Sequence, residues 1–69
     1  MTEKSVVGVI VEVRPQALYR VRLESGKIVT ARISSSLRHA TLRFVVHDRV
    51  VLNLSQQDPQ RGQIIQRAN

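Results

Sequence analysis

Cysteine is missing from this 69-residue chain, and aromatic side chains are scarce, with one tyrosine, one phenylalanine and no tryptophan. Without cysteine the chain forms neither a disulfide framework nor a thiolate metal site, which fits a reducing compartment. No apolar run approaches the ~20 residues that cross a bilayer. The first residues also lack the charged-then-apolar pattern of a secretory signal. We therefore expect a cytoplasmic protein with no membrane partner.

Spacings typical of catalytic or metal sites are missing as well. The three glycines are too scattered for a phosphate-binding loop, and neither a Gly-x-Ser-x-Gly turn nor a paired-carboxylate motif occurs. The two histidines, His39 and His47, stand eight positions apart with no third ligand nearby. We expect no enzymatic activity, no cofactor and no metal.

Acidic residues are few compared with basic ones. Five Asp and Glu stand against eleven Lys and Arg, which gives a net charge of +6. Nine of these eleven cations are arginine, whose planar guanidinium binds phosphate in a bidentate manner and stacks on bases. A single arginine is often only a solvated surface group. The excess as a whole favours a nucleic acid as partner over a membrane surface, which needs a long amphipathic helix.

Apolar residues make up 42% of the chain and alternate with polar ones at the period of β-strands. Val7, Val9, Val11 and Val13 recur at period two, as in a strand of β-branched residues with one buried face. We predict a strand over residues 6–14 with these valines facing inward.

Two further alternating runs, residues 18–24 and 27–33, are separated by a Ser-Gly break. This spacing predicts a β-hairpin. Its outer face would bring Arg20, Arg22 and Arg32 together.

The period changes after the third strand. Leu37, Thr41 and Phe44 follow at helical spacing, with Ser34 as a candidate cap, so we predict a short helix there. Two more strands are predicted, over residues 49–54 and 63–67.

Five short strands with a helix after the third suit a small closed barrel of the OB-fold type. An SH3-like barrel is the competing architecture, with a single short turn before its last strand. We predict one all-β domain over residues 1–69, with residues 1–5 flexible.

The two aromatic residues, Tyr19 and Phe44, fall on the apolar phase of their elements, so we expect them in the core. A surface on which bases stack is then largely missing. Binding would depend on phosphate, ribose and shape contacts, which suits folded RNA.

The chain also resembles a known family along almost its whole length. Residues 8–12 (GVIVE) and 18–34 (LYRVRLESGKIVTARIS) resemble bacterial translation initiation factor 1. Residues 47–50 (HDRV) are similar to the family's Gly-Asp-Lys-Val turn, and residues 61–67 (RGQIIQR) to its C-terminal strand.

This resemblance implies an OB-fold that binds the small ribosomal subunit at the decoding A site, against 16S-type ribosomal RNA and an adjacent ribosomal protein. There it would block elongator tRNA and, with the other initiation factors, assist placement of initiator tRNA. It would do so as a monomer without catalysis. A stand-alone OB-fold RNA chaperone or single-strand RNA binder is the alternative.

Basic positions of the family's RNA-facing surface match Arg32, Arg38, Arg43, Arg61 and Arg67. Arg20 and Lys27 sit beside them on the same predicted side, and His39 completes the predicted RNA-binding set. The chain departs from the family's usual cations at four positions, Ser36, His39, Gln63 and Asn69, and carries additional cations at Arg14 and Arg22.

Overall fold

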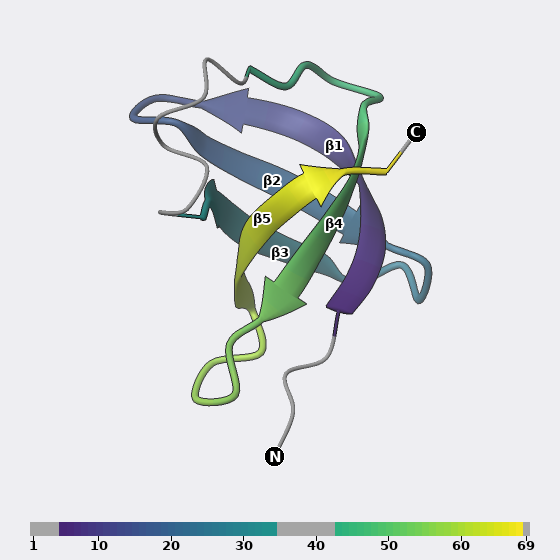
Figure 1. Cartoon of the computed structure of the whole chain (residues 1–69), viewed down its shortest axis with the longest axis vertical. Helices are drawn as coiled ribbons and strands as arrows, with labels where there is room; N and C mark the ends of the chain where they lie inside the picture. The colour runs from purple at the N-terminus through teal and green to yellow at the C-terminus, as the bar shows by residue number, and fades with distance from the viewer. Residues whose placement is uncertain (1–4, 35–42, 69) are drawn as a thin grey trace.

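The computed structural model describes residues 5–34 and 43–68, which contain five β-strands (Figure 1). In chain order these are β1 (Ser5–Arg14), β2 (Leu18–Leu23), β3 (Ile28–Ile33), β4 (Arg49–Leu54) and β5 (Arg61–Arg67). They form a closed barrel in the order β1-β2-β3-β5-β4, and β4 pairs back onto β1. Neighbouring strands are antiparallel except β3 and β5, which run parallel.

This strand order is that of the OB-fold, and it confirms the predicted all-β, five-stranded barrel. The predicted strand bounds differ from the observed ones by at most two residues. The predicted short helix centres on residues 35–42, which lie outside the described residues. On either side of that segment, Ser34, Arg43 and Phe44 belong to neither a helix nor a strand.

β1 closes the barrel because it pairs with two strands at once. Its first half, Ser5–Val9, pairs with β4, and its second half, from Gly8 to Arg14, pairs with β2. A register shift between Ile10 and Glu12 interrupts the ladder. Such bulges bend and twist a strand, which allows β1 to pass from one partner to the other.

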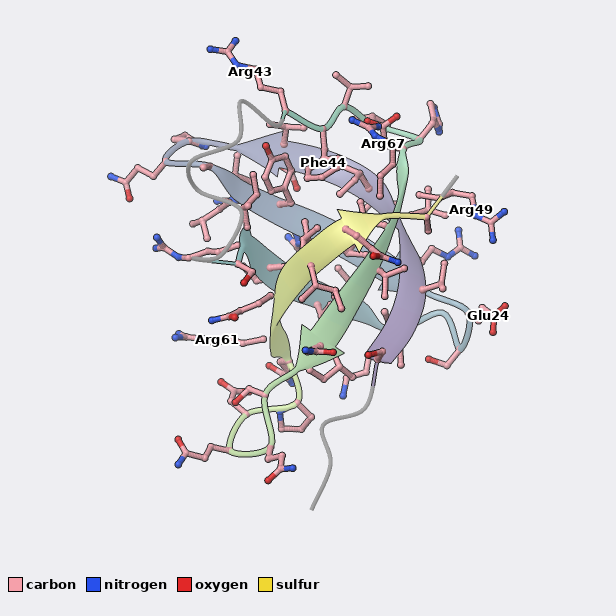
Figure 2. All side chains as sticks on the ribbon, in the orientation of Figure 1. Glu24, Arg43, Phe44, Arg49, Arg61 and Arg67 are labelled. Carbon is pink, nitrogen blue, oxygen red and sulfur yellow. The ribbon has the colours of Figure 1, made fainter. Side chains whose placement is uncertain are left out.

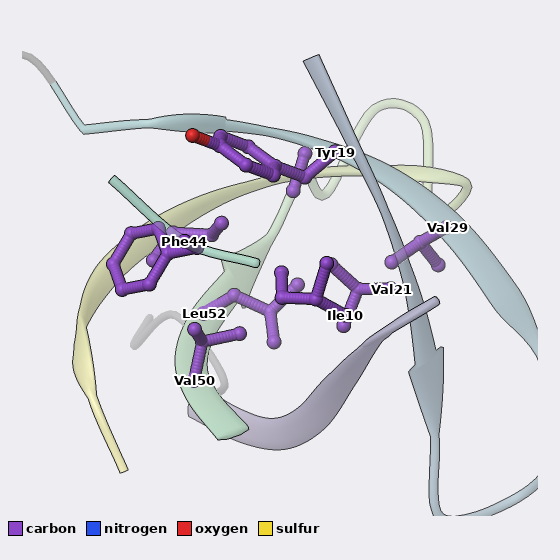
Figure 3. Packing of buried hydrophobic residues seen from close by; sticks show 9 residues of the cluster. Ile10, Tyr19, Val21, Val29, Phe44, Val50 and Leu52 are labelled. Atoms are coloured by element: carbon purple, nitrogen blue, oxygen red, sulfur yellow. The ribbon is translucent and has the colours of Figure 1, made fainter. Parts of the chain in front are cut away.

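The core receives side chains from all five strands and from the segment that precedes β4 (Figure 3). Its buried members are Ile10, Tyr19, Val21, Val29, Ala31, Phe44, Val50, Leu52 and Ile64. The Tyr19 and Phe44 rings meet edge to face, with their centroids 5.7 Å apart. The expected core position of both aromatic residues is therefore confirmed.

The predicted inward face of β1 is wrong. Ile10 is fully buried, whereas Val11 and Val13 are 39% and 48% exposed. The inward phase includes Gly8, where an added Cβ would collide with the Val21 side chain and lie 3.0 Å from the Arg22 carbonyl oxygen. Because the inward phase contains a glycine and the outward phase is rich in valine, period-two alternation selected the wrong face.

Candidate nucleic-acid interface

An open groove of about 820 Å³ lies where the start of β5, the end of β4 and the loop between them meet β2 and β3. In an OB-fold, the faces of β2 and β3 and the loop between β4 and β5 bind oligonucleotides. Most of the residues that line this groove are polar or basic, among them Thr30, Arg32, Asn53, Gln57, Arg61 and Gln63, and Leu18 and Leu54 are its apolar members.

The parallel pairing of β3 with β5 places the cations of this groove. In its register, Thr30 lies beside Arg61 and Arg32 lies beside Gln63. On the other side of β3, Arg20 of β2 is opposite Thr30. Residues paired in this way project to the same face of a sheet. Arg20, Arg32 and Arg61 therefore share the outer surface of three adjacent strands, although they are far apart in sequence.

The loop over residues 55–60 is held by its own hydrogen bonds. The Ser55 hydroxyl accepts hydrogen bonds from the backbone N–H groups of Gln57 and Asp58, both at 3.2 Å. The Asp58 carboxylate accepts one from the Gln60 N–H at 3.1 Å, and the Gln60 carbonyl accepts one from the Thr30 N–H of β3 at 2.9 Å. Side-chain bonds of this kind fix turns, so this wall of the groove has a defined shape before any ligand binds.

Arg61 is a highly accessible cation of the groove, with a side chain that is 78% exposed. Its Nε lies 3.5 Å from the Asp58 carboxylate, which is itself half exposed. Exposed ion pairs of this kind contribute little stability. Arg61 can therefore exchange this partner for a phosphate at small cost.

The groove offers side-chain amides and guanidinium groups, with no aromatic side chain among the described residues that line it. Asn53, Gln56, Gln57 and Gln63 supply amide donors and acceptors suited to ribose hydroxyls, phosphates and base edges. Arg32 and Arg61 supply charge. This combination favours the predicted phosphate, ribose and shape contacts over base stacking.

The rest of the predicted RNA-binding set is distributed around the barrel. Lys27 lies in the turn between β2 and β3, five residues along the chain from Arg32. Arg43 lies at the opposite end of the barrel from the loop of residues 55–60, and is exposed (Figure 2). Arg38 and His39 lie outside the described residues. Contact of each with RNA stays a prediction.

Of the two arginines predicted to converge with Arg32, Arg20 shares its outer surface but also faces Glu12, whereas Arg22 lies farther along the sheet. Arg20 lies 3.9 Å from Glu12 of β1, which also pairs with Arg14 at 3.5 Å. Arg22 is opposite Ile28, four residues along β3 from Arg32, and lines a different groove. A strand advances about 3.3 Å per residue, so four positions along β3 separate Arg22 from Arg32. The predicted convergence is therefore wrong for Arg22.

Arg67 is tied into the fold. Its Nη1 lies 3.1 Å from the Asp48 carboxylate, its Nη2 donates to the Arg43 carbonyl at 3.4 Å, and its guanidinium lies over the Phe44 ring at 5.0 Å. Asp48 also accepts a hydrogen bond from the Val45 N–H at 3.0 Å. This hydrogen bond, together with Arg67, holds the pKa of Asp48 below its ordinary value. Among the described members of the predicted set, Arg67 therefore has the clearest structural role.

Sequence reasoning did not select Asn53, Gln56 or Gln57, which line the groove. The polar composition of residues 55–61 marks a loop, but no local signal shows that this loop faces β3. Only the parallel pairing of β5 with β3 does so.

Two further properties of the described residues bear on function. Within residues 5–34 and 43–68, no three His, Asp or Glu side chains gather to hold a metal ion. No helix formed by these same residues is of the length and apolarity that a membrane crossing requires.

Known proteins with the same barrel include an initiation factor. The chain superposes on the solution structure of translation initiation factor 1 from the Wolbachia endosymbiont strain TRS of Brugia malayi with a TM-score of 0.80. The two are 27% identical, and the match covers 99% of this chain and 80% of the other.

Two larger proteins share the fold alone. They are YloQ, a circularly permuted GTPase (20% identity, TM-score 0.76), and YjeQ from Thermotoga maritima (19% identity, TM-score 0.77). Each match covers 96% of this chain and 23% of the larger protein.

The family described as Translation initiation factor 1A / IF-1 matches the chain over residues 1–69. A match over this length, together with the barrel and the likeness to an initiation factor structure, identifies an RNA-binding OB-fold. The chain belongs to the translation initiation factor 1A / IF-1 family.

Proposed function

We propose that this initiation factor binds the small ribosomal subunit at the decoding A site through contacts with ribosomal RNA. There it blocks elongator tRNA and assists placement of initiator tRNA. Its partners are the 16S-type RNA, an adjacent ribosomal protein and the other initiation factors. It acts in the cytoplasm, as a monomer and without catalysis of its own. Family membership supports the small subunit as the partner. The A site is the location on that subunit that we propose.

The observation that carries the proposal is the polar groove with Arg32 and Arg61 on its surface. A groove that lacks an aromatic platform gains little from unstacked single strands, for which base stacking supplies about 1–3 kcal/mol per base. Folded RNA presents phosphates and 2′-hydroxyls in a fixed arrangement, which a preformed polar surface recognises by shape. The loop of residues 55–60, held by its own hydrogen bonds, provides such a preformed surface.

Among the described arginines of the predicted RNA-binding set, three are best placed to contact RNA. Arg32 and Arg43 are exposed and form no ion pair with a carboxylate of residues 5–34 or 43–68. Arg61 forms one exposed pair. Arg20 forms an ion pair with Glu12, and the Arg67 guanidinium packs over the Phe44 ring. We therefore assign these two arginines smaller roles in binding.

Chemical footprinting of the decoding-site adenines on isolated small subunits tests the proposal. We expect stoichiometric protection of these adenines that is lost when a ligand of the decoding site is added in excess. An unchanged footprint at saturating protein would refute A-site binding. Melting of arbitrary RNA hairpins at many equivalent sites, with no protection on the subunit, would instead indicate a stand-alone RNA chaperone.

Salt dependence tests the contribution of individual arginines. Neutralising about five phosphates gives a slope of log affinity against log salt concentration near −3.5, at roughly −0.7 per phosphate. Arg61→Ala should flatten this slope by about 0.7. Arg49→Ala is the matched control, because Arg49 projects from the side of the barrel away from Arg61 (Figure 2). Equal slopes for the wild type and Arg61→Ala would remove Arg61 from the interface.

A further inference from the structure

A second groove, of about 380 Å³, lies on the outer face of β1. Its floor is formed by Val7, Val9 and Val11, and Arg22 and Arg49 stand at its sides. Val11 is 39% exposed, although it is a large aliphatic residue on a strand. This groove is separate from the polar groove over β3, β5 and the loop of residues 55–60, since the two grooves share no lining residue.

Strand register explains why two arginines flank this apolar floor. Val9 is paired with Arg22 of β2 on one side and with Arg49 of β4 on the other. Adjacent strands lie about 4.8 Å apart, so the two arginine backbones stand roughly 10 Å apart with Val9 between them. Paired residues project to the same face, so both guanidinium groups rise from the surface that exposes the valine.

Neither arginine is neutralised within the described part of the chain. Arg14, Arg20, Arg61 and Arg67 each have a carboxylate within 4.0 Å. Among residues 5–34 and 43–68, neither Arg22 nor Arg49 has such a carboxylate. Glu24 also lines the groove, but two guanidinium groups against one carboxylate leave the groove basic. A partner that complements this groove therefore carries negative charge.

The apolar floor distinguishes between the two classes of anionic macromolecule. RNA would reach Arg22 and Arg49 with its phosphates, but its bases gain little from aliphatic side chains, which have no π-face on which to stack. A protein segment supplies both kinds of contact, because carboxylates pair with guanidinium groups and aliphatic side chains bury valine surface. Chemical complementarity therefore favours a protein.

His47 adds to the rim of this groove from a strained backbone conformation, with φ at 84°. Two hydrogen bonds keep this turn against β1: the His47 N–H donates to the Ile10 carbonyl at 2.8 Å, and the Ile10 N–H donates to the Asp48 carbonyl at 2.9 Å. Residues in such conformations persist only where their surroundings fix them. The rim is therefore held in place before a partner binds.

We propose that the groove over Val7, Val9 and Val11 is a docking site for an acidic protein segment. The segment places aliphatic side chains on the three valines and carboxylates beside Arg22 and Arg49. The site does not depend on the proposed A-site function, because it lies on another part of the barrel.

Titrations followed by amide NMR of the full chain test this proposal. The probes are a short peptide of alternating leucine and glutamate, the same peptide with lysine in place of glutamate, and an oligouridine. We expect the glutamate peptide to shift the amide signals of Val7, Val9 and Val11 in a saturable way. The lysine peptide and oligouridine should leave these three signals unchanged.

The double variant Arg22→Glu/Arg49→Glu should bind the glutamate peptide about tenfold more weakly, since two exposed ion pairs of modest strength become repulsive. The matched control, Arg32→Glu/Arg61→Glu, changes the same charge in the other groove and should bind the peptide as the wild type does. The dispersed amide spectrum reports that each variant is folded. Unchanged affinity in the first double variant would overturn the proposal, as would oligouridine or the lysine peptide shifting the three valine signals.

Discussion

The direction in which β1 faces can be tested with one pair of adjacent substitutions. Ile10 is fully buried, and Val11, the next residue, is 39% exposed. We expect Ile10→Asp to be unfolded and Val11→Asp to remain folded. Simple alternation of valines predicts the reverse, because it places Val11 in the core.

The expected magnitudes separate the two variants clearly. A chain of 69 residues has a free energy of unfolding of about 3.5–10 kcal/mol, at roughly 0.05–0.15 kcal/mol per residue. Ile10→Asp removes a core side chain at a cost of about 3 kcal/mol and adds the several kcal/mol of an unpaired buried carboxylate. Val11→Asp loses at most about 1 kcal/mol of apolar burial and up to about 1 kcal/mol of β-propensity.

Far-ultraviolet circular dichroism and urea unfolding measure both outcomes. Val11→Asp should keep the native spectrum and unfold at a lower urea concentration. The loss in its free energy of unfolding should be no more than about 2 kcal/mol. Ile10→Asp should lack a cooperative transition. An unfolded Val11→Asp beside a folded Ile10→Asp would refute the inward position of Ile10 and the bulge that follows it.

Three further substitutions test local features. Gly62→Ala should lower the free energy of unfolding by about 1–3 kcal/mol in urea, because the added Cβ would lie 2.7 Å from the Asn53 carbonyl oxygen; an unchanged midpoint contradicts this. Ala17→Gly should raise it by about 0.5–1 kcal/mol, because Ala17 has a φ of 57°, and a lower melting temperature would disprove the strain. The pKa of Asp48 is lowered from 3.8, so its ionised form stabilises the fold above that pH, and this stabilisation is lost as pH falls through the lowered value. Asp48→Asn should therefore unfold with a flatter acid dependence in pH titrations, and a profile parallel to that of the wild type would show that the fold does not lower the pKa of Asp48.

Local pattern was sufficient where a strand has one apolar and one polar phase. In β2, Tyr19 and Val21 are buried while Arg20 and Arg22 are exposed, as their alternation predicts. The same holds for Val50 and Leu52 of β4. In such strands the cost of burying a charge leaves one orientation.

Local pattern failed in β1 because both of its phases are largely apolar. The choice between them depends on neighbours from other parts of the chain. The inward phase has room for Val21 only because Gly8 has no side chain. The outward valines then lie between the arginines of β2 and β4.

The amino-acid sequence by itself determined the closed five-stranded barrel, the core aromatic residues, the basic character and, through resemblance, the family. The barrel, the core aromatic residues and the basic character follow from periodicity and composition, which act over a few neighbouring residues or over the chain as a whole. Only the tertiary structure decided which arginines share a surface. The parallel pairing of β3 with β5 places Arg32 and Arg61 on the same outer surface. The two partners of β1 bring Arg22 and Arg49 to either side of Val9. Such contacts depend on strand register between distant segments, which no local property of the sequence sets.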